Sequence, residues 1–132
     1  MIADWPRVLI LDDDDIIRVN LVAFFEDENF IVRSAISAET GLQLIATEPF
    51  HAGVIDIRLP GMDGNGFILR AHEICPAMKF IVHTGSADYV LPETLTAIGL
   101  TSRHVFTKPL KDMRLLIQAV KELIETPQLP ER

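Results

Sequence analysis

The chain has 132 residues, 48% of them hydrophobic and 23% charged, which is typical of one globular domain and excludes a disordered or fibrous chain. Its formal net charge of −7 argues against direct binding to nucleic acid or to anionic membranes. One cysteine excludes an intramolecular disulfide framework, and no apolar run reaches the roughly 20 residues of a membrane-spanning helix. The first residues lack the pattern of a signal peptide, so we expect a cytoplasmic protein with a single domain over residues 1–132.

Short apolar runs alternate with helical patterns along the chain. The runs that predict strands cover residues 7–11, 30–36, 51–57, 79–84 and 105–107. Apolar residues at helical spacing predict helices over residues 16–29, 37–49, 67–74, 92–98 and 113–124. Residues 58–66 are rich in Gly, Pro, Asp and Asn, which favours a loop. We therefore expect a folded core over residues 7–125, with a short tail at each end.

Strands that alternate with helices predict an α/β fold. Crossover connections between parallel strands are right-handed, so the helices cover both faces of a parallel sheet. In such a doubly wound sheet the binding site lies beyond the carboxyl ends of the strands. The polar residues that follow the predicted strands are therefore the candidates for a functional site.

Carboxylates follow two of these strands. Four aspartates occupy residues 12–15; helix capping explains Asp14 and Asp15 well, but not Asp12 and Asp13 at the strand end. Asp56 lies in the apolar run of the third strand, where a carboxylate is costly unless it is paired or coordinated. Alone, Asp56 would more simply cap a nearby loop. Beside the other two it indicates a shared divalent cation, and oxygen ligands suit Mg²⁺.

Thr84 and Lys108 follow the fourth and fifth strands. Taken alone, Thr84 is more simply a threonine that bonds its own loop, and Lys108 is more simply a solvated lysine. Beside an acidic cluster, however, the ammonium group can pair with carboxylates or with a phosphoryl group. The set fits phosphoryl transfer to a carboxylate, with Asp56 as the nucleophile and a metal ion neutralising the oxygens. Lys108 and the Thr84 hydroxyl would bind the remaining phosphoryl oxygens.

Four segments resemble a known family when taken in order. They are VLILDDDDIIR (8–18), VIDIRLPGMDG (54–64), FIVHTGS (80–86) and FTKPL (106–110). Together they resemble the receiver domain of bacterial two-component response regulators, of the chemotaxis-regulator type, over roughly residues 7–125. The resemblance implies a flavodoxin-like, doubly wound fold with a five-stranded parallel sheet in the order 2-1-3-4-5 and helices on both faces.

The resemblance also implies a function. Asp56 would accept a phosphoryl group from a sensor histidine kinase or a histidine phosphotransfer protein, and the chain would act as a phosphorylation-dependent signalling switch. Mg²⁺ would be the cofactor, bound directly by Asp13, Asp56 and the backbone carbonyl of Arg58, with Asp12 acting largely through water. These roles come from the family, because the spacing of the residues does not assign them.

Further expectations follow from the same resemblance. Thr84 and Lys108 match the family's switch hydroxyl and its lysine. The chain would catalyse only its own phosphorylation and dephosphorylation, so it would not be an enzyme. It would pass its state to a downstream protein target or an output domain, without direct contact with nucleic acid or membrane. The resemblance also allows a homodimer through the fourth helix, the fifth strand and the fifth helix.

One position departs from the family. The switch aromatic of receivers lies three residues before the lysine, and here that position is Val105. Phe106 is one residue later, which on a strand means the opposite face. This departure keeps open an alternative function, a degenerate receiver that acts as a constitutive protein-interaction module. A third reading, a haloacid dehalogenase-like phosphohydrolase, lacks the acidic motif that should follow Lys108.

Two other side chains carry hypotheses. The side chain of Arg58, two residues after Asp56, could fold over the phosphoryl group and shield it from water, or it could simply be solvated. The chain has four histidines without metal-ligand spacing, and we expect His83 to pack within the fourth strand.

Overall fold

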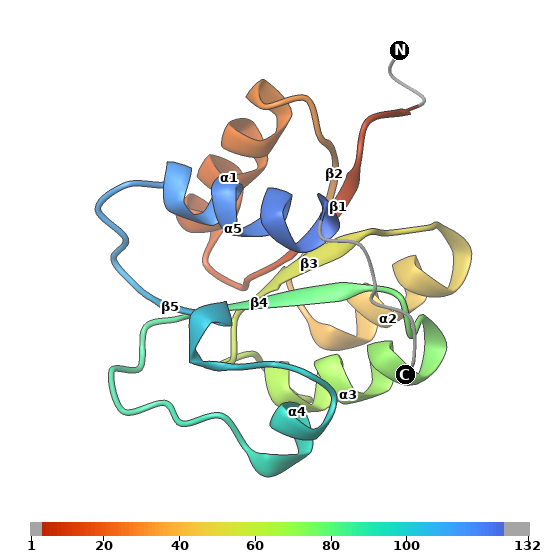
Figure 1. The fold of residues 1–132 in the computed structure, drawn as a ribbon, viewed down its shortest axis with the longest axis vertical. Coiled ribbons are helices and arrows are strands. Elements are labelled where there is room, and N and C mark those ends of the chain that lie inside the picture. Colours follow the sequence, from red (N-terminus) through yellow and green to blue (C-terminus); the bar gives the residue numbers. More distant parts are fainter. Residues whose placement is uncertain (1–3, 126–132) are drawn as a thin grey trace.

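The computed structural model describes residues 4–125, which form a parallel sheet with helices on both faces (Figure 1). The strands are β1 (Arg7–Leu11), β2 (Ile31–Ala35), β3 (Ala52–Ile55), β4 (Lys79–Thr84) and β5 (Val105–Thr107). They lie in the order β2-β1-β3-β4-β5, and every neighbouring pair is parallel. The predicted α/β fold and its strand order 2-1-3-4-5 are therefore confirmed.

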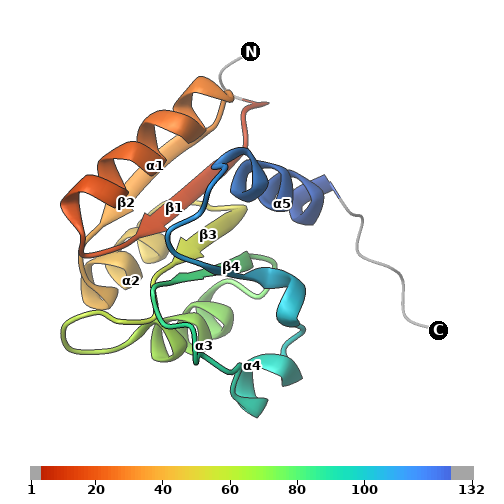
Figure 2. The same cartoon turned by 90° about the vertical axis from the view of Figure 1, so that its left-hand side faces the viewer.

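The helices form two layers, one on each face of the sheet. They are α1 (Asp15–Asp27), α2 (Ala38–Thr47), α3 (Gly64–Ile74), α4 (Glu93–Ala97) and α5 (Arg114–Glu125), with a short 3₁₀ helix over Ser102–His104. Figure 2 shows α1 and α5 on one side of the strands and α2, α3 and α4 on the other. Within residues 4–125, no helix is long and apolar enough to cross a membrane.

Each face of the sheet contributes to its own apolar cluster. Neighbouring strand residues point to opposite faces, so Leu9 and Leu11 of β1 join one cluster while Val8 and Ile10 join the other. The cluster on the α2 and α3 side includes Ile55, Phe67, Ile68, Val82 and Leu95. The cluster on the α1 and α5 side includes Leu21, Phe25, Val54, Ile81 and Leu116. A sheet buried on both faces explains why the strands read as unbroken apolar runs.

The helices begin where side chains cap them. The carboxylate of Asp14 accepts hydrogen bonds from the backbone N–H groups of Ile16 and Ile17 at the start of α1. The hydroxyl of Ser37 does the same for α2 by accepting from the N–H of Thr40. The interpretation of Asp14 as a capping residue is confirmed.

The third helix begins earlier than the sequence indicated. We expected a loop over residues 58–66, but α3 starts at Gly64, because Asp63 caps it by accepting from the N–H of Gly66. Gly64 packs against the backbone that follows β3, and a Cβ at this position would collide with the carbonyl oxygen of Asp56. Gly64, one of the glycines that suggested a loop, is therefore needed for a close contact between the start of α3 and the end of β3.

The side chains of Val105 and Phe106 in β5 point to opposite faces of the sheet. Val105 packs against the α2 and α3 side of the core, whereas Phe106 packs against the α1 and α5 side. The prediction that Phe106 faces away from the position of Val105 is confirmed. The α4 helix spans only five residues after Pro92, and no side chain caps its start.

Candidate functional site

The carboxylates of Asp12 and Asp56 lie side by side at the carboxyl ends of β1 and β3. The N–H of Asp56 donates to the carbonyl of Leu11 at 2.8 Å, and the N–H of Asp12 donates to the carbonyl of Ala35 at 3.2 Å. These bonds extend the sheet by one residue and fix both side chains at its edge. Asp12 is 2% and Asp56 5% exposed, so both carboxylates are almost removed from water.

Asp13 completes an acidic cluster at this edge. One carboxylate oxygen from each of Asp12, Asp13 and Asp56 lies within 4.8 Å of the others. Asp13 is exposed, so the cluster opens toward solvent on its side. All three donors are hard oxygens, a set that fits a divalent cation such as Mg²⁺ and not a metal that prefers sulfur or imidazole. The predicted convergence of these three residues is confirmed.

Lys108 reaches the cluster from the end of β5. Its Nζ donates to Oδ2 of Asp12 at 2.9 Å and forms an ion pair with Oδ2 of Asp56 at 3.3 Å. Burial alone would lower the pKa of Lys108, but the hydrogen bond to Asp12 and the two carboxylate charges raise it above its ordinary value. The group therefore stays an ammonium ion at neutral pH, as the predicted role requires.

Burial governs the acidity of Asp56. It raises the pKa of this carboxyl group, and the negative charge of Asp12 adds to the effect, while the charge of Lys108 and the hydrogen bond from the backbone N–H of Arg58 oppose it. One lysine faces three carboxylates, so the site carries excess negative charge. A bound divalent cation would offset that excess, which is an electrostatic reason for the cluster to bind one.

Thr84 ends β4, the neighbour of β3 in the sheet. Its side chain is fully buried, and its Oγ1 accepts a hydrogen bond from the N–H of Ser86 at 3.1 Å. The Thr84 hydroxyl is thus hydrogen-bonded to the backbone of its own loop, as the simpler of the two interpretations predicted. The N–H of Lys108 donates to the carbonyl of Thr84 at 2.7 Å, so the backbones of these two residues are joined at the edge of the site.

Arg58 contributes its backbone to the site. Its N–H donates to Oδ1 of Asp56 at 3.2 Å, which places this stretch of backbone beside the carboxylate. The residue is exposed, and within residues 4–125 its guanidinium forms no hydrogen bond or ion pair. Its proposed shielding of a phosphoryl group stays a prediction.

Arg18 is a site residue that sequence reasoning missed. Its guanidinium donates to the backbone carbonyl of Asp12 at 3.0 Å and pairs with Asp15 at 2.6 Å. Arg18 therefore stabilises the turn between β1 and α1, which carries Asp12 and Asp13. The available signal in the sequence was that Arg18 follows the aspartates by about one helical turn. Only the folded structure shows which carbonyl its guanidinium reaches.

His83 lies on β4 next to Thr84, as expected, and is 2% exposed. Neither of its ring nitrogens has a hydrogen-bond partner within the described residues. Burial, with the nearby charge of Lys108, lowers its pKa to about 4, so the ring is neutral at neutral pH.

Comparisons with known proteins agree with this geometry. The chain matches the sequence profile of the response regulator receiver domain over residues 8–121. It is 30% identical over 124 residues to the probable chemotaxis protein CheY of Rhizobium etli, covering 90% of this chain and 95% of that protein. It is also similar to a solved CheY-like receiver domain protein from Methanospirillum hungatei, with a TM-score of 0.80, 32% identity, and coverage of 92% and 95% of the two chains.

Other relatives are longer, or share only the fold. The chain spans 32% of the Bacillus subtilis regulatory protein YesN, and 49% of the Pseudomonas aeruginosa transcriptional regulatory protein AruR. The response regulator TrrA of Thermotoga maritima, solved in complex with Mg²⁺ and beryllium fluoride, is 21% identical and has a TM-score of 0.77 over 89% of this chain and 98% of that chain. The sheet order, the residues at its carboxyl edge and the profile match over residues 8–121 agree, and the chain belongs to the family of response regulator receiver domains.

Proposed function

We propose that this chain is a Mg²⁺-dependent phosphorylation switch in which Asp56 accepts the phosphoryl group. The observation that carries the proposal is the cluster of Asp12, Asp13 and Asp56, whose carboxylate oxygens lie within 4.8 Å of one another, with the ammonium group of Lys108 paired to Asp12 and Asp56. A phosphoryl group arriving at this edge would meet a nucleophile, a cation site and a lysine together.

The hydrogen-bond distances support Asp56 rather than Asp12 as the acceptor of the phosphoryl group. Both oxygens of Asp12 accept hydrogen bonds at 2.9 Å, one from the N–H of Asp14 and one from Lys108. The corresponding distances at Asp56 are longer, 3.2 Å to the N–H of Arg58 and 3.3 Å to Lys108. Asp56 therefore keeps the more available oxygen, while Asp12 is held in place.

The reaction follows from these contacts. An Asp56 oxygen forms a bond to phosphorus as the bond between phosphorus and the donor's leaving group breaks, and the leaving group carries the electron pair away. Bound Mg²⁺ would supply charge neutralisation at the phosphoryl oxygens. Lys108 would shift toward one phosphoryl oxygen, and the buried Thr84 hydroxyl would donate to another. The chain's own catalysis would be limited to this transfer and to hydrolysis of the product.

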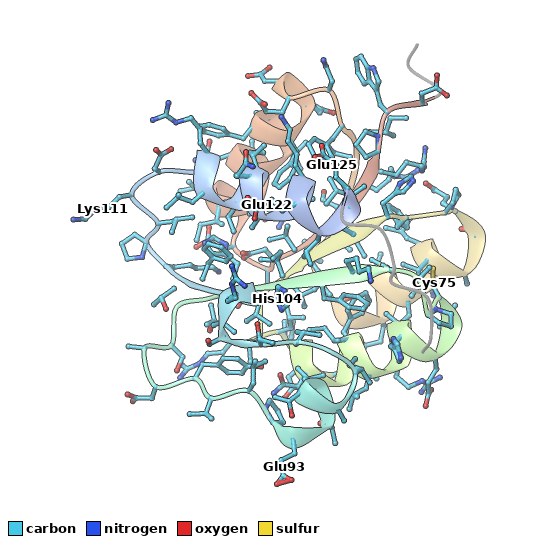
Figure 3. The ribbon with its side chains drawn as sticks, in the orientation of Figure 1. Cys75, Glu93, His104, Lys111, Glu122 and Glu125 are labelled. Atoms are coloured by element: carbon cyan, nitrogen blue, oxygen red, sulfur yellow. The ribbon has the colours of Figure 1, made fainter. Side chains whose placement is uncertain are left out.

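The donor and the recipient of the signal are proteins in this proposal. A sensor histidine kinase or a histidine phosphotransfer protein would supply the group, and a downstream target or an output domain would read the state. A homodimer would use the face of α4, β5 and α5; Figure 3 shows Lys111 pointing outward from the loop before α5, and Glu93 pointing outward from α4 in a different direction. Arg114 on that face already pairs with Asp112 at 2.9 Å.

Incubation with acetyl phosphate and Mg²⁺, followed by intact-mass spectrometry, tests the proposal. We expect one phosphoryl adduct that requires Mg²⁺ and is absent in Asp56→Asn, a variant that keeps the size of the side chain. Asp27→Asn, an exposed position at the end of α1, has the same change in mass and should still form the adduct.

Failure of the wild-type chain to form an adduct, while it still binds Mg²⁺, would overturn chemical self-phosphorylation. It would favour the alternative, a constitutive interaction module, which one observation supports. The side chain of β5 that faces the α2 and α3 side is Val105, which lies opposite Val82 of β4, so β5 offers no aromatic ring on that face to follow the hydroxyl of Thr84.

A further inference from the structure

The chain's one tyrosine joins the loop after β4 to the start of α3. Tyr89 lies in the β4–α4 loop, residues 85–92, and its hydroxyl donates to Oδ1 of Asn65 in the first turn of α3 at 2.6 Å. The ring is half-buried against the core cluster on the α2 and α3 side. Burial and the nearby charge of Asp63 raise the pKa of this phenol, so it keeps the proton that it donates.

A series of hydrogen bonds connects Tyr89 to Thr84. The N–H of Ser86 donates to Oγ1 of Thr84 at 3.1 Å, and the N–H of Tyr89 donates to the carbonyl of Ser86 at 3.3 Å. With the bond to Asn65, three hydrogen bonds in sequence lead from the hydroxyl at the end of β4 to α3. Displacement of Thr84 Oγ1 would therefore pull on the loop and on its attachment to α3.

The Thr84 hydroxyl still has a proton to donate. A hydroxyl group donates one hydrogen bond and accepts two, and within residues 4–125 Oγ1 of Thr84 only accepts. A phosphoryl group on Asp56 would provide an acceptor for that proton. Moving Oγ1 toward it would carry the N–H of Ser86 along, and with it the loop that Tyr89 holds.

No aromatic residue of β5 is placed to respond to this movement. Val105 faces the same side of the sheet as the β4–α4 loop, and Phe106 packs on the opposite side. Tyr89 is the aromatic side chain connected to Thr84 through hydrogen bonds. A movement of the Thr84 hydroxyl can therefore reach the β4–α4 loop through Tyr89.

We propose that the Tyr89–Asn65 hydrogen bond is a latch: it holds the β4–α4 loop in its unphosphorylated position and opens when Thr84 engages a phosphoryl group on Asp56. This inference rests on the proposed function. By linkage, a latch that phosphorylation opens must also oppose phosphorylation, because the coupling between two sites is reciprocal. Tyr89 is thus a positioning residue that acts through Thr84.

Fluorine NMR on the full chain tests the latch directly. With 3-fluorotyrosine incorporated, the single tyrosine gives one signal, and beryllofluoride bound at Asp56 in the presence of Mg²⁺ gives its own signals in the same spectrum. We expect the tyrosine signal to move as the beryllofluoride signals appear. In Asn65→Ala, the tyrosine signal before any addition should already lie toward its position in the loaded wild type.

Affinity measurements provide the second readout. Tyr89→Phe keeps the ring and removes only the hydroxyl, so it and Asn65→Ala should each bind beryllofluoride roughly threefold to tenfold more tightly than the wild type, the worth of one hydrogen bond. The double variant should bind no more tightly than either single variant, because both remove the same bond. A merely structural role would lower the melting temperature and leave the affinity unchanged.

The outcomes separate this inference from the proposed function. Beryllofluoride signals with a stationary tyrosine signal, or with equal affinities in all variants, would overturn the latch alone. Absence of beryllofluoride signals in a wild type that still binds Mg²⁺ would overturn the proposed function, and the latch with it.

Discussion

Lys108 compensates two buried carboxylates, and its removal should be costly. Its Nζ lies 2.9 Å from Asp12 and 3.3 Å from Asp56, and both partners are almost fully buried. Breaking a buried ion pair on one side leaves an unpaired charge in low dielectric. We expect Lys108→Met to lower the free energy of unfolding by about 3 kcal/mol in urea titrations at neutral pH without metal.

Lys121→Met is the matched control for this change. Lys121 pairs with Glu28 at 3.0 Å, but both side chains are more than a third exposed, so its loss should cost less than about 1 kcal/mol. Equal losses in the two variants would show that the ammonium group of Lys108 is not needed to compensate the cluster. Mg²⁺ should narrow the difference in stability between Lys108→Met and the wild type, whereas Lys121→Met, whose acidic cluster is intact, should gain as much stability as the wild type.

His83 should make the chain sensitive to acid. Burial lowers its folded pKa to about 4 from the ordinary 6.5, so the folded chain binds the proton more weakly than the unfolded chain. Stability from this residue is therefore complete above pH 6.5 and is lost as the pH falls toward 4, by about 3 kcal/mol in all. We expect His83→Leu to remove that part of the pH dependence in urea titrations; the same slope in both chains would contradict it.

At the scale of elements, α3 is positioned by contact with the strand end that carries Asp56. A Cβ on Gly64 would collide with the carbonyl oxygen of Asp56, and backbone cannot move aside as a side chain can. We expect Gly64→Ala to destabilise the chain by roughly 2 kcal/mol and to weaken beryllofluoride binding. At Gly85 a Cβ would meet no atom within 4 Å, so Gly85→Ala should change stability by less than about 0.5 kcal/mol.

The elements that could be predicted from sequence are those whose own residues determine them. The predicted ranges of β1, β4 and β5 match the structure, because an apolar run between polar residues defines each strand. The prediction was wrong at α3, where Gly64 and Gly66 indicated a loop. Nothing local reveals that Gly64 is small because the backbone of Asp56 lies against it.

The same distinction holds for the site. Asp12, Asp56 and Lys108 could be placed together because the carboxyl ends of parallel strands meet at one edge. Arg18 and the Tyr89–Asn65 pair could not, since their contacts depend on how two loops fold. Sequence patterns report periodic structure, whereas loop contacts depend on tertiary arrangement.

At the scale of the whole molecule, the clustered carboxylates lower the stability of the metal-free chain, and the same carboxylates form the candidate metal site. The chain has a net charge of −7, and three of its carboxylates lie within 4.8 Å of one another. Burial and the Asp12 charge raise the pKa of Asp56, so an ionised Asp56 destabilises the fold at neutral pH until a cation offsets its charge. Asp13 adds a third carboxylate with an oxygen within 4.8 Å of the other two, so without metal Asp13→Asn should unfold at a slightly higher urea concentration than the wild type.

Mg²⁺ should reverse that order. A cation that binds only the folded chain adds about 2.7 kcal/mol at a concentration one hundred times its dissociation constant. The wild type should gain this stability, whereas Asp13→Asn, with one ligand oxygen set removed, should gain much less at the same concentration. Urea titrations in Mg²⁺, with sodium chloride at equal ionic strength as the control, compare the two chains. Equal gains would mean that Mg²⁺ acts by general screening of the charge of −7 and not at the cluster, because screening does not depend on which carboxylate is removed.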